Sequence, residues 1–247
     1  MSFLYQKPGI TIKYQGTVAV IVQREYRTSS EKRHESMIKG ADISHYQGII
    51  DWDKVSLDFV ISKCTEYDKV DAMYQRNRDG ARSRGILFGS YHFARGTNPV
   101  KEADFFVKSV GDMKAGELLA LDWEISHNDP VGWCKKWLAR VNELVGFRPL
   151  VYMNSSTSKR YDWSPISGDN GLWVAQYGVN DGQMNGKPDI GASFPWWVIW
   201  QYTSRGRVNG IQGNVDLDVL GGMMTLDQLK KYGKPAECSH CTIHCPR

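Results

Sequence analysis

The sequence lacks the features typical of membrane, secreted and nucleic-acid-binding proteins. No hydrophobic run is long enough to cross a membrane, and TVAVIV at 17–22 is too short for a typical signal-peptide core. The net charge is only +4, with basic and acidic residues interspersed and no basic stripe. These absences predict a protein with no signal peptide, no stable membrane association and no nucleic-acid partner.

Cysteine is also scarce, and its pattern predicts no disulfide framework. The chain has five cysteines, an odd number, and Cys64 and Cys134 stand alone. The other three lie in CSHCTIHC at 238–245, a stretch with the composition of soft metal ligands but with no second C-x-x-C half elsewhere. We expect a reducing cytoplasm and a peripheral tail over residues 233–247 that holds no metal. Zinc binding by that tail is the alternative.

The first 36 residues differ from the rest of the chain. The β-prone stretch GITIKYQGTVAVIVQREY is followed by the polar run RTSSEKRHES, which together predict an appended hairpin or loose arm over residues 1–36. Met37 stands directly before the first strong strand and is an alternative start. With 247 residues, 41% of them hydrophobic, the chain can bury a full core. We place that core in one domain, residues 37–232.

Short apolar, β-branched or aromatic runs recur through this domain. Eight such runs predict strands at 40–44, 59–66, 86–94, 118–124, 149–154, 172–177, 197–202 and 215–220. Helices are predicted at about 71–84, 100–110 and 130–145. The later connections are rich in Gly, Asn and Pro and predict no helix. Alternating strands and helices indicate a parallel sheet, here an α/β barrel of eight strands with its last helices missing.

Four acids stand where these strands begin or end. LLALDWE places Asp122 and Glu124 two positions apart, so on a strand both side chains face the same side. Asp42 lies at the end of the first strand, and Asp216 at the beginning of the eighth. In α/β barrels the catalytic groups lie where the loops form an open mouth, at the C-terminal ends of the strands. We therefore expect the four acids to meet at one mouth.

Aromatic and amide side chains accompany the acids at the strand ends. They are Tyr91, His92, Tyr152, Gln201 and Tyr202. Acids ringed by aromatic residues favour a glycosidase, in which one acid keeps its proton to protonate the leaving oxygen and another stays ionised. A nearby negative charge raises the pKa of a carboxyl group, so we expect the charge of one member of the Asp122 and Glu124 pair to raise the pKa of the other.

Several of these assignments have a structural alternative. Most acid pairs two positions apart are solvated surface, so spacing alone is weak evidence for catalysis. His92 fits a packed, hydrogen-bonded residue as well as a substrate ligand. Trp196, Trp197 and Trp200 include at least one core residue, because adjacent positions on a strand face opposite sides.

Eight motifs occur in a fixed order along the chain. They are GADISHYQGIIDW (40–52), FVISKCTE (59–66), GILFGSYHFAR (85–95), LLALDWE (118–124), PLVYMN (149–154), LWVAQY (172–177), WQYTS (200–204) and GNVDLDV (213–219). In these motifs the sequence resembles glycoside hydrolase family 25, the Chalaropsis-type lysozymes of bacteriophages, bacteria and some fungi. The resemblance covers about residues 38–222. It departs from the family at Tyr67, where Gly is common, and in the arm at 1–36.

The resemblance implies a fold, an activity and site residues. The fold is a modified (β/α)5(β)3 barrel, and the activity is hydrolysis of the β-1,4 bond between N-acetylmuramic acid and N-acetylglucosamine in peptidoglycan. Glu124 falls on the family's acid/base, and Asp42, Asp122 and Asp216 on its other acids. His92, Tyr152, Trp173 and Gln201 fall in segments that border the sugar. No cofactor or metal is implied, and the resemblance favours net retention assisted by the substrate's acetamido group.

The leading functional hypothesis is a phage endolysin. Such a protein would stay in the host cytoplasm until the membrane is permeabilised and then bind peptidoglycan glycan strands in the cell wall, acting as a monomer. A non-catalytic glycan-binding or virion structural protein on the same scaffold is the alternative, and it would be indicated by a lost acid at the mouth. A chitin-directed barrel hydrolase is less consistent, because such enzymes usually carry a longer run of alternating acids than DWE.

Overall fold

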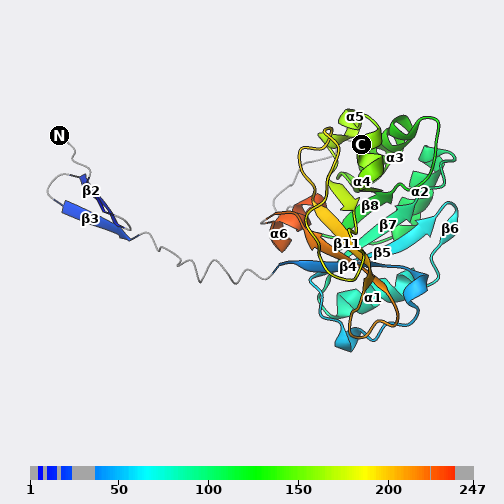
Figure 1. The fold of residues 1–247 in the computed structure, drawn as a ribbon, viewed down its shortest axis with the longest axis horizontal. Coiled ribbons are helices and arrows are strands. Elements are labelled where there is room, and N and C mark those ends of the chain that lie inside the picture. Colours follow the sequence, from blue (N-terminus) through cyan, green and yellow to red (C-terminus); the bar gives the residue numbers. More distant parts are fainter. Residues whose placement is uncertain (1–4, 8–9, 16–17, 24–36, 223, 237–247) are drawn as a thin grey trace, which may run out of the picture. The chain divides into compact units, whose positions relative to one another are not determined.

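The computed structural model describes residues 5–7, 10–15, 18–23, 37–222 and 224–236 (Figure 1). The chain divides into two units, residues 1–37 and 38–247. In the first unit, strands β1 (Tyr5–Lys7), β2 (Ile10–Gln15) and β3 (Val18–Gln23) form an antiparallel sheet in that order. The arm predicted at the start of the chain thus contains three short strands.

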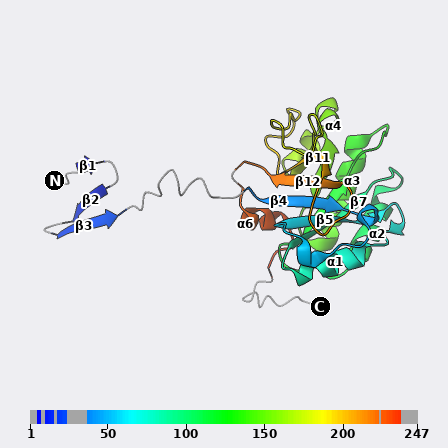
Figure 2. The same cartoon turned by 60° about the horizontal axis from the view of Figure 1, so that its bottom comes forward.

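The second unit is a closed barrel of eight strands. They are β4 (Lys39–Ile43), β5 (Phe59–Glu66), β7 (Leu87–Phe93), β8 (Leu118–Asp122), β9 (Leu150–Asn154), β10 (Leu172–Ala175), β11 (Ile199–Gly206) and β12 (Val215–Leu220). β4 pairs with both β5 and β12, which closes the sheet; these three strands lie side by side in Figure 2. The predicted eight-stranded α/β barrel is confirmed.

One strand runs against the expected direction. β12 is antiparallel to both of its neighbours, β11 and β4, whereas the other neighbouring strands of the barrel are parallel. The expectation of a fully parallel sheet is therefore wrong for this strand. Because β12 is reversed, it begins at the end of the barrel where the others finish, and Asp216 is the register partner of Asp42. The reversal brings a fourth acid to the mouth.

Three long helices follow the early strands, as predicted. They are α1 (Tyr74–Ser83), α2 (Pro99–Val110) and α3 (Pro130–Val145). The side chains of Asn98 and Asp129 cap α2 and α3 by accepting hydrogen bonds from backbone N–H groups in the first turn. Both α2 and α3 start with Pro, at a position where the backbone N–H would have no partner within the helix.

Several short elements were not predicted from the sequence. They are η2 (His45–Gln47), η3 (Trp52–Lys54), β6 (Lys69–Val70), α4 (Ser155–Arg160), α5 (Ser164–Ser167), α6 (Leu226–Leu229) and η4 (Lys230–Tyr232). Elements of one or two turns are too short to display a hydrophobic period. The connections at 176–198 and 207–214 contain no helix, as expected for a barrel whose last helices are missing.

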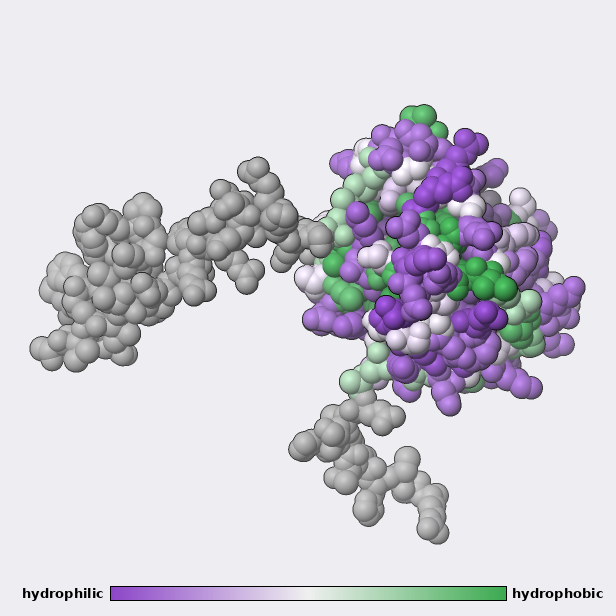
Figure 3. Space-filling model, turned by 90° about the horizontal axis from the view of Figure 1, so that it is seen from below, coloured by the Kyte–Doolittle hydropathy of each residue, from purple (hydrophilic) through white to green (hydrophobic). Residues whose placement is uncertain are grey.

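The core has two layers, and strand alternation assigns residues to them. In β8, Leu118 and Ala120 belong to the cluster inside the barrel, while Leu119 and Leu121 belong to the cluster between the barrel and its helices. The same alternation turns Asp122 inward. Hydrophilic residues cover most of the face seen in Figure 3. Among the described residues, no helix has the length and apolar character needed to span a bilayer.

Candidate active site

A cavity of about 230 Å³ opens where the parallel strands end, and all four predicted acids line it. Asp42 comes from β4, Asp122 from β8 and Asp216 from β12, while Glu124 lies two residues beyond the end of β8. Residues from distant parts of the sequence thus meet at one mouth because the barrel closes between β12 and β4. The geometry is the one expected from the strand ends.

The DWE segment keeps its alternation after the strand ends. The Trp123 N–H donates to the Tyr152 carbonyl oxygen at 3.0 Å, which continues the pairing with β9 by one residue. The Trp123 side chain turns outward and is buried against Trp133, with ring centroids 5.0 Å apart. Asp122 and Glu124 therefore both face the cavity, Asp122 buried and Glu124 accessible at the mouth.

The electrostatics of the cavity favour protonated carboxyl groups. Burial and the charge of Glu124 raise the pKa of Asp122 well above its usual value. Partial burial likewise raises the pKa of Glu124. Burial and the charge of Glu124 raise the pKa of Asp216 to about 6. Because each ionised group disfavours the next, the site retains protons near neutral pH, which general acid catalysis requires.

A hydrogen-bonded chain fixes the position of Asp42. The Gln201 Nε2 group donates to Asp42 Oδ2 at 2.6 Å. The Gln201 Oε1 atom accepts from the hydroxyl groups of Tyr152, at 2.9 Å, and Tyr177, at 2.6 Å. Two donors on the amide oxygen leave the amide nitrogen to face Asp42, so the orientation of Gln201 is determined. These hydrogen bonds connect residues of β4, β9 and β11 at the Asp42 carboxylate.

A fifth acid, Asp218, lies beneath the cavity and was not among the predicted site residues. Its side chain is fully buried, and its Oδ1 atom accepts a hydrogen bond from Trp173 Nε1 at 2.8 Å. Burial raises the pKa of Asp218 well above its usual value, while the hydrogen bond from Trp173 opposes the rise. Alternation in VDLD already placed Asp216 and Asp218 on one face, so the sequence did contain a signal.

Four of the predicted substrate-binding residues line the cavity: Tyr91, Tyr152, Trp173 and Gln201. The Trp173 ring lies edge-on to Tyr152 and Tyr91, with centroids 4.7 and 6.3 Å apart. All four side chains are largely buried, so they form the floor of the cavity. The cavity is also lined by Ser44, Tyr46, Phe93 and Tyr177, which stand at or just beyond strand ends, and by three residues that were not predicted, Gln47, Lys63 and Ser204.

The predicted substrate contact of His92 does not agree with the structure. His92 is fully buried outside the barrel, next to Tyr91, which faces inward. Its Nδ1 atom is 2.7 Å from Thr65 Oγ1, its Nε2 atom is 2.8 Å from Glu102 Oε2, and its ring stacks on Trp137. Burial lowers the pKa of His92, and Glu102 opposes that shift. The packed alternative for this residue is therefore correct.

Tyr202 is also displaced from the predicted site. It follows Gln201, which points into the barrel, and so its own ring lies on the outer side. There it contacts Trp200, with ring centroids 6.0 Å apart. The wrong assignment of His92 and Tyr202 has one cause, since each is the outward neighbour of an inward residue.

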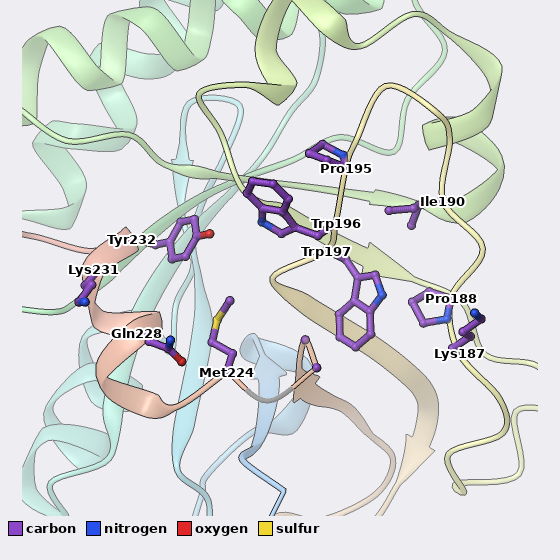
Figure 4. Close-up of a pocket in the computed structure, with 12 residues that line it drawn as sticks. Lys187, Pro188, Ile190, Pro195, Trp196, Trp197, Met224, Gln228, Lys231 and Tyr232 are labelled. Atoms are coloured by element: carbon purple, nitrogen blue, oxygen red, sulfur yellow. The ribbon is translucent and has the colours of Figure 1, made fainter. Parts of the chain in front are cut away.

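A larger hollow of about 990 Å³ lies near the beginning of β11, at the end of the barrel opposite the catalytic cavity (Figure 4). Trp196, Trp197, Met224 and Tyr232 surround it, and Trp196 is 58% exposed. Trp200, by contrast, is buried core. No Asp or Glu is among the described residues that line this hollow, so it lacks the groups for acid catalysis.

The described residues form no metal site. The Cys/His stretch at 238–245 lies outside the described residues, and so does the alternative of zinc binding there. Among the residues described, no group of three or more His, Cys, Asp or Glu side chains is arranged to hold a metal ion. Cys64 and Cys134 are buried and unpaired, and burial raises the pKa of the Cys64 thiol to about 12.

Comparisons with known proteins agree with this geometry. The chain is 29% identical over 211 residues to Lysozyme M1 of Streptomyces globisporus, across 76% of this chain and 69% of the relative. It is 30% identical to an autolytic lysozyme of Clostridium acetobutylicum, across 77% of this chain and 60% of the relative. The structure resembles the catalytic domain of an endolysin from a Listeria monocytogenes bacteriophage, with TM-score 0.69 and 25% identity, covering 79% of this chain and 98% of that domain.

The family model described as "Glycosyl hydrolases family 25" matches residues 41–211. This match spans β4 through the connection that precedes β12, and so contains Asp42, Asp122 and Glu124. Asp216 lies just beyond it and is joined to it by the pairing of β12 with β4. The chain therefore belongs to glycosyl hydrolases family 25, and it is a glycoside hydrolase of the lysozyme type.

Proposed function

We propose that this glycoside hydrolase cleaves the β-1,4 bond between N-acetylmuramic acid and N-acetylglucosamine in bacterial peptidoglycan. The observation that carries the proposal is the meeting of Asp42, Asp122, Glu124 and Asp216 in one cavity, where burial raises the pKa of each carboxyl group and Glu124 remains accessible. The lysozyme names of the bacterial relatives support peptidoglycan as the substrate.

Glu124 is the acid/base in this proposal. Its accessibility lets it reach the glycosidic oxygen, and its raised pKa keeps a proton available for the leaving group. After the bond breaks, the ionised Glu124 takes a proton from the attacking water, which releases the product. Asp42, fixed by Gln201, and Asp216 would hold Glu124 and the sugar in position.

Asp122 is the group proposed to assist the substrate's own acetamido group. Its Oδ1 atom is buried and has no hydrogen-bond partner among the described residues. An unpaired buried acceptor is costly, and an acetamido N–H group would supply the missing donor. With that N–H held, the acetamido oxygen can attack the anomeric carbon as the leaving oxygen takes its proton from Glu124. The outcome is net retention of configuration.

Product analysis tests the bond that is cleaved. Purified protein is incubated with purified cell walls, and the released muropeptides are reduced and identified by mass spectrometry. We expect new reducing ends on N-acetylmuramic acid. Reducing ends on N-acetylglucosamine would contradict the proposed bond, and the absence of any soluble product would favour the non-catalytic glycan-binding alternative. None of the four acids that catalysis would need is missing from the mouth.

We propose further that the protein acts as a phage endolysin, and as a monomer. The similarity to a phage endolysin catalytic domain supports this role. The endolysin would collect in the host cytoplasm and reach the wall when the membrane is permeabilised. Expression in a susceptible bacterium tests the idea. We expect lysis only after a pore-forming agent is added, whereas lysis without permeabilisation would contradict it.

A further inference from the structure

A second hollow adjoins the catalytic cavity, and we call it the side pocket. It has a volume of about 560 Å³, and its lining includes Lys63, Tyr67, Lys69, Asp71 and Arg95. Lys63 lines both the side pocket and the catalytic cavity, so the two hollows share a wall. The side pocket therefore lies directly beside the carboxyl groups of the catalytic cavity, with Lys63 between them.

The turn that carries Tyr67 has an unusual backbone. β5 and β6 form a hairpin in which Glu66 pairs with Lys69, leaving Tyr67 and Asp68 as the turn. Tyr67 has a φ of 54°, and the first position of a two-residue turn with positive φ favours Gly. The other non-glycine residue with positive φ in the described part of the chain is Asn180, an amino acid that tolerates this conformation. A bulky side chain in such a position suggests a function for the ring.

The Tyr67 ring is available to a ligand. The residue is 44% exposed, and its hydroxyl group makes no hydrogen bond to another described residue. Its backbone N–H donates to the Phe93 carbonyl oxygen at 3.4 Å, which ties the turn to β7. The strained turn therefore presents an aromatic ring at the edge of the side pocket, beside the catalytic mouth.

Some of the charged side chains of the side pocket are paired with one another, and one positive charge is left unpaired in the part of the chain that the structure describes. Lys63 Nζ lies 3.1 Å from Glu66 Oε2 and 4.0 Å from Asp71 Oδ2, and Arg95 also contacts Glu66. Lys69 is exposed and forms no ion pair with a described residue. The half-exposed Arg95 lies over the ring of Phe93, which lines the catalytic cavity. Within the described chain, Lys69 is thus an unpaired cation at the side pocket, and the half-exposed Arg95, paired with Glu66, is a second cation beside it.

We propose that the side pocket binds the peptide branch of the N-acetylmuramic acid unit whose glycosidic bond is cleaved. This inference rests on the proposed muramidase function. Muramic acid carries a lactyl group on O3, and in the wall this group is extended by a peptide with free carboxylates. Tyr67 packs against the peptide, while Lys69 and Arg95 face its carboxylates. The enzyme therefore prefers glycan strands that still carry their peptides.

Paired substrates test this proposal. Soluble glycan fragments are used either with their peptides or after an amidase has removed them, and kcat/KM is measured for both. Tyr67→Gly removes the ring and gives the turn the residue that its φ favours, so the variant is expected to fold. Lys69→Ala removes one exposed charge. Lys101→Ala, an exposed lysine on α2, is the matched control.

We expect Tyr67→Gly and Lys69→Ala each to lower kcat/KM about five-fold on the peptide-bearing fragment. On the peptide-free fragment, kcat/KM of both variants should equal that of the wild type. Lys101→Ala should match the wild type on both. An equal loss on both fragments would overturn the proposal and make the side pocket a sugar site. No loss on either fragment would overturn it as well. If the wild type cleaves neither fragment, the muramidase function itself fails.

Discussion

The two ends of the barrel differ in size and in chemistry. The hollow near Trp196 has about four times the volume of the catalytic cavity, 990 against 230 Å³, and carries aromatic residues without acids among its described lining. The catalytic cavity is smaller and contains four carboxyl groups whose pKa values are raised, first by burial and, for Asp42, Asp122 and Asp216, also by neighbouring carboxylates. The clustering of carboxyl groups, and not the volume of a cavity, therefore identifies the active site of this molecule.

The largest effect is expected at the mouth, from Glu124→Gln. The amide keeps the shape of the side chain but has no proton to give to the leaving oxygen, so kcat on peptidoglycan should fall about 10³-fold. The rate of turbidity loss of a wall suspension measures this. Circular dichroism and the melting temperature serve as the control and should match the wild type, since Glu124 is accessible. Retention of a tenth of the activity would remove Glu124 as the acid.

A smaller effect, on stability, is expected from Asp218→Asn beneath the mouth. The folded-state pKa of Asp218 lies well above the unfolded value, so the folded protein holds the proton more tightly and loses stability as the pH rises between the two values. An asparagine can still accept from Trp173 and does not ionise. The variant should therefore gain about 1–2 kcal/mol in unfolding free energy at pH 8 relative to the wild type, with less gain at pH 5.

Denaturant unfolding at both pH values measures this difference. Glu143→Gln, a change at an exposed acid of α3, is a control that should leave the pH dependence near that of the wild type. An Asp218→Asn variant that is equally destabilised at pH 5 and pH 8 would show that Asp218 acts by packing alone.

A shift in pH profile is expected from Asp216→Asn. The interaction between Asp216 and Glu124 is mutual, so the Asp216 charge that disfavours ionisation of Glu124 disappears in the variant. The pKa of Glu124 should fall, and the alkaline limb of kcat/KM should move to lower pH by several tenths of a unit. Asp216→Glu, which keeps the charge, should leave the limb in place. A limb that moves to higher pH would contradict the assigned coupling.

The smallest effect is expected at the opposite end, from Trp196→Ala. Because Trp196 is 58% exposed and lies away from the carboxyl groups, the variant should keep the kcat/KM of the wild type on soluble glycan fragments. Its unfolding free energy should change by less than about 0.5 kcal/mol. A loss of activity on soluble fragments comparable to that of Glu124→Gln would remove the distinction between the two ends.

Much of the barrel could be predicted from the sequence because its strands are short apolar runs separated by long amphipathic helices. The direction of β12 was missed, although the connection at 207–214 carried the signal. Parallel neighbours need a crossover of a dozen or more residues, and this connection is shorter, so it can only join antiparallel strands. The 176–198 connection between β10 and β11 is long enough for a parallel crossover without a helix.

The acids of the site were predictable because they stand at strand ends, but the faces of their neighbours were not. The Asp122 and Glu124 pair sets the phase of β8, whereas nothing in YHF or WQY indicates which residue points inward. His92 and Tyr202 were assigned to the wrong face for that reason. Lys63 was missed because it lies in the middle of a buried strand, where a cation is not expected without partners.

The central claim is that Glu124 protonates the leaving oxygen, and the dependence on the leaving group tests it most directly. Glu124→Gln and the wild type are compared on a natural glycan fragment and on the same sugar carrying a dinitrophenyl leaving group, which departs without a proton. We predict a loss of about 10³-fold in kcat/KM on the natural fragment and less than about ten-fold on the dinitrophenyl substrate. Equal losses on both substrates would contradict the account.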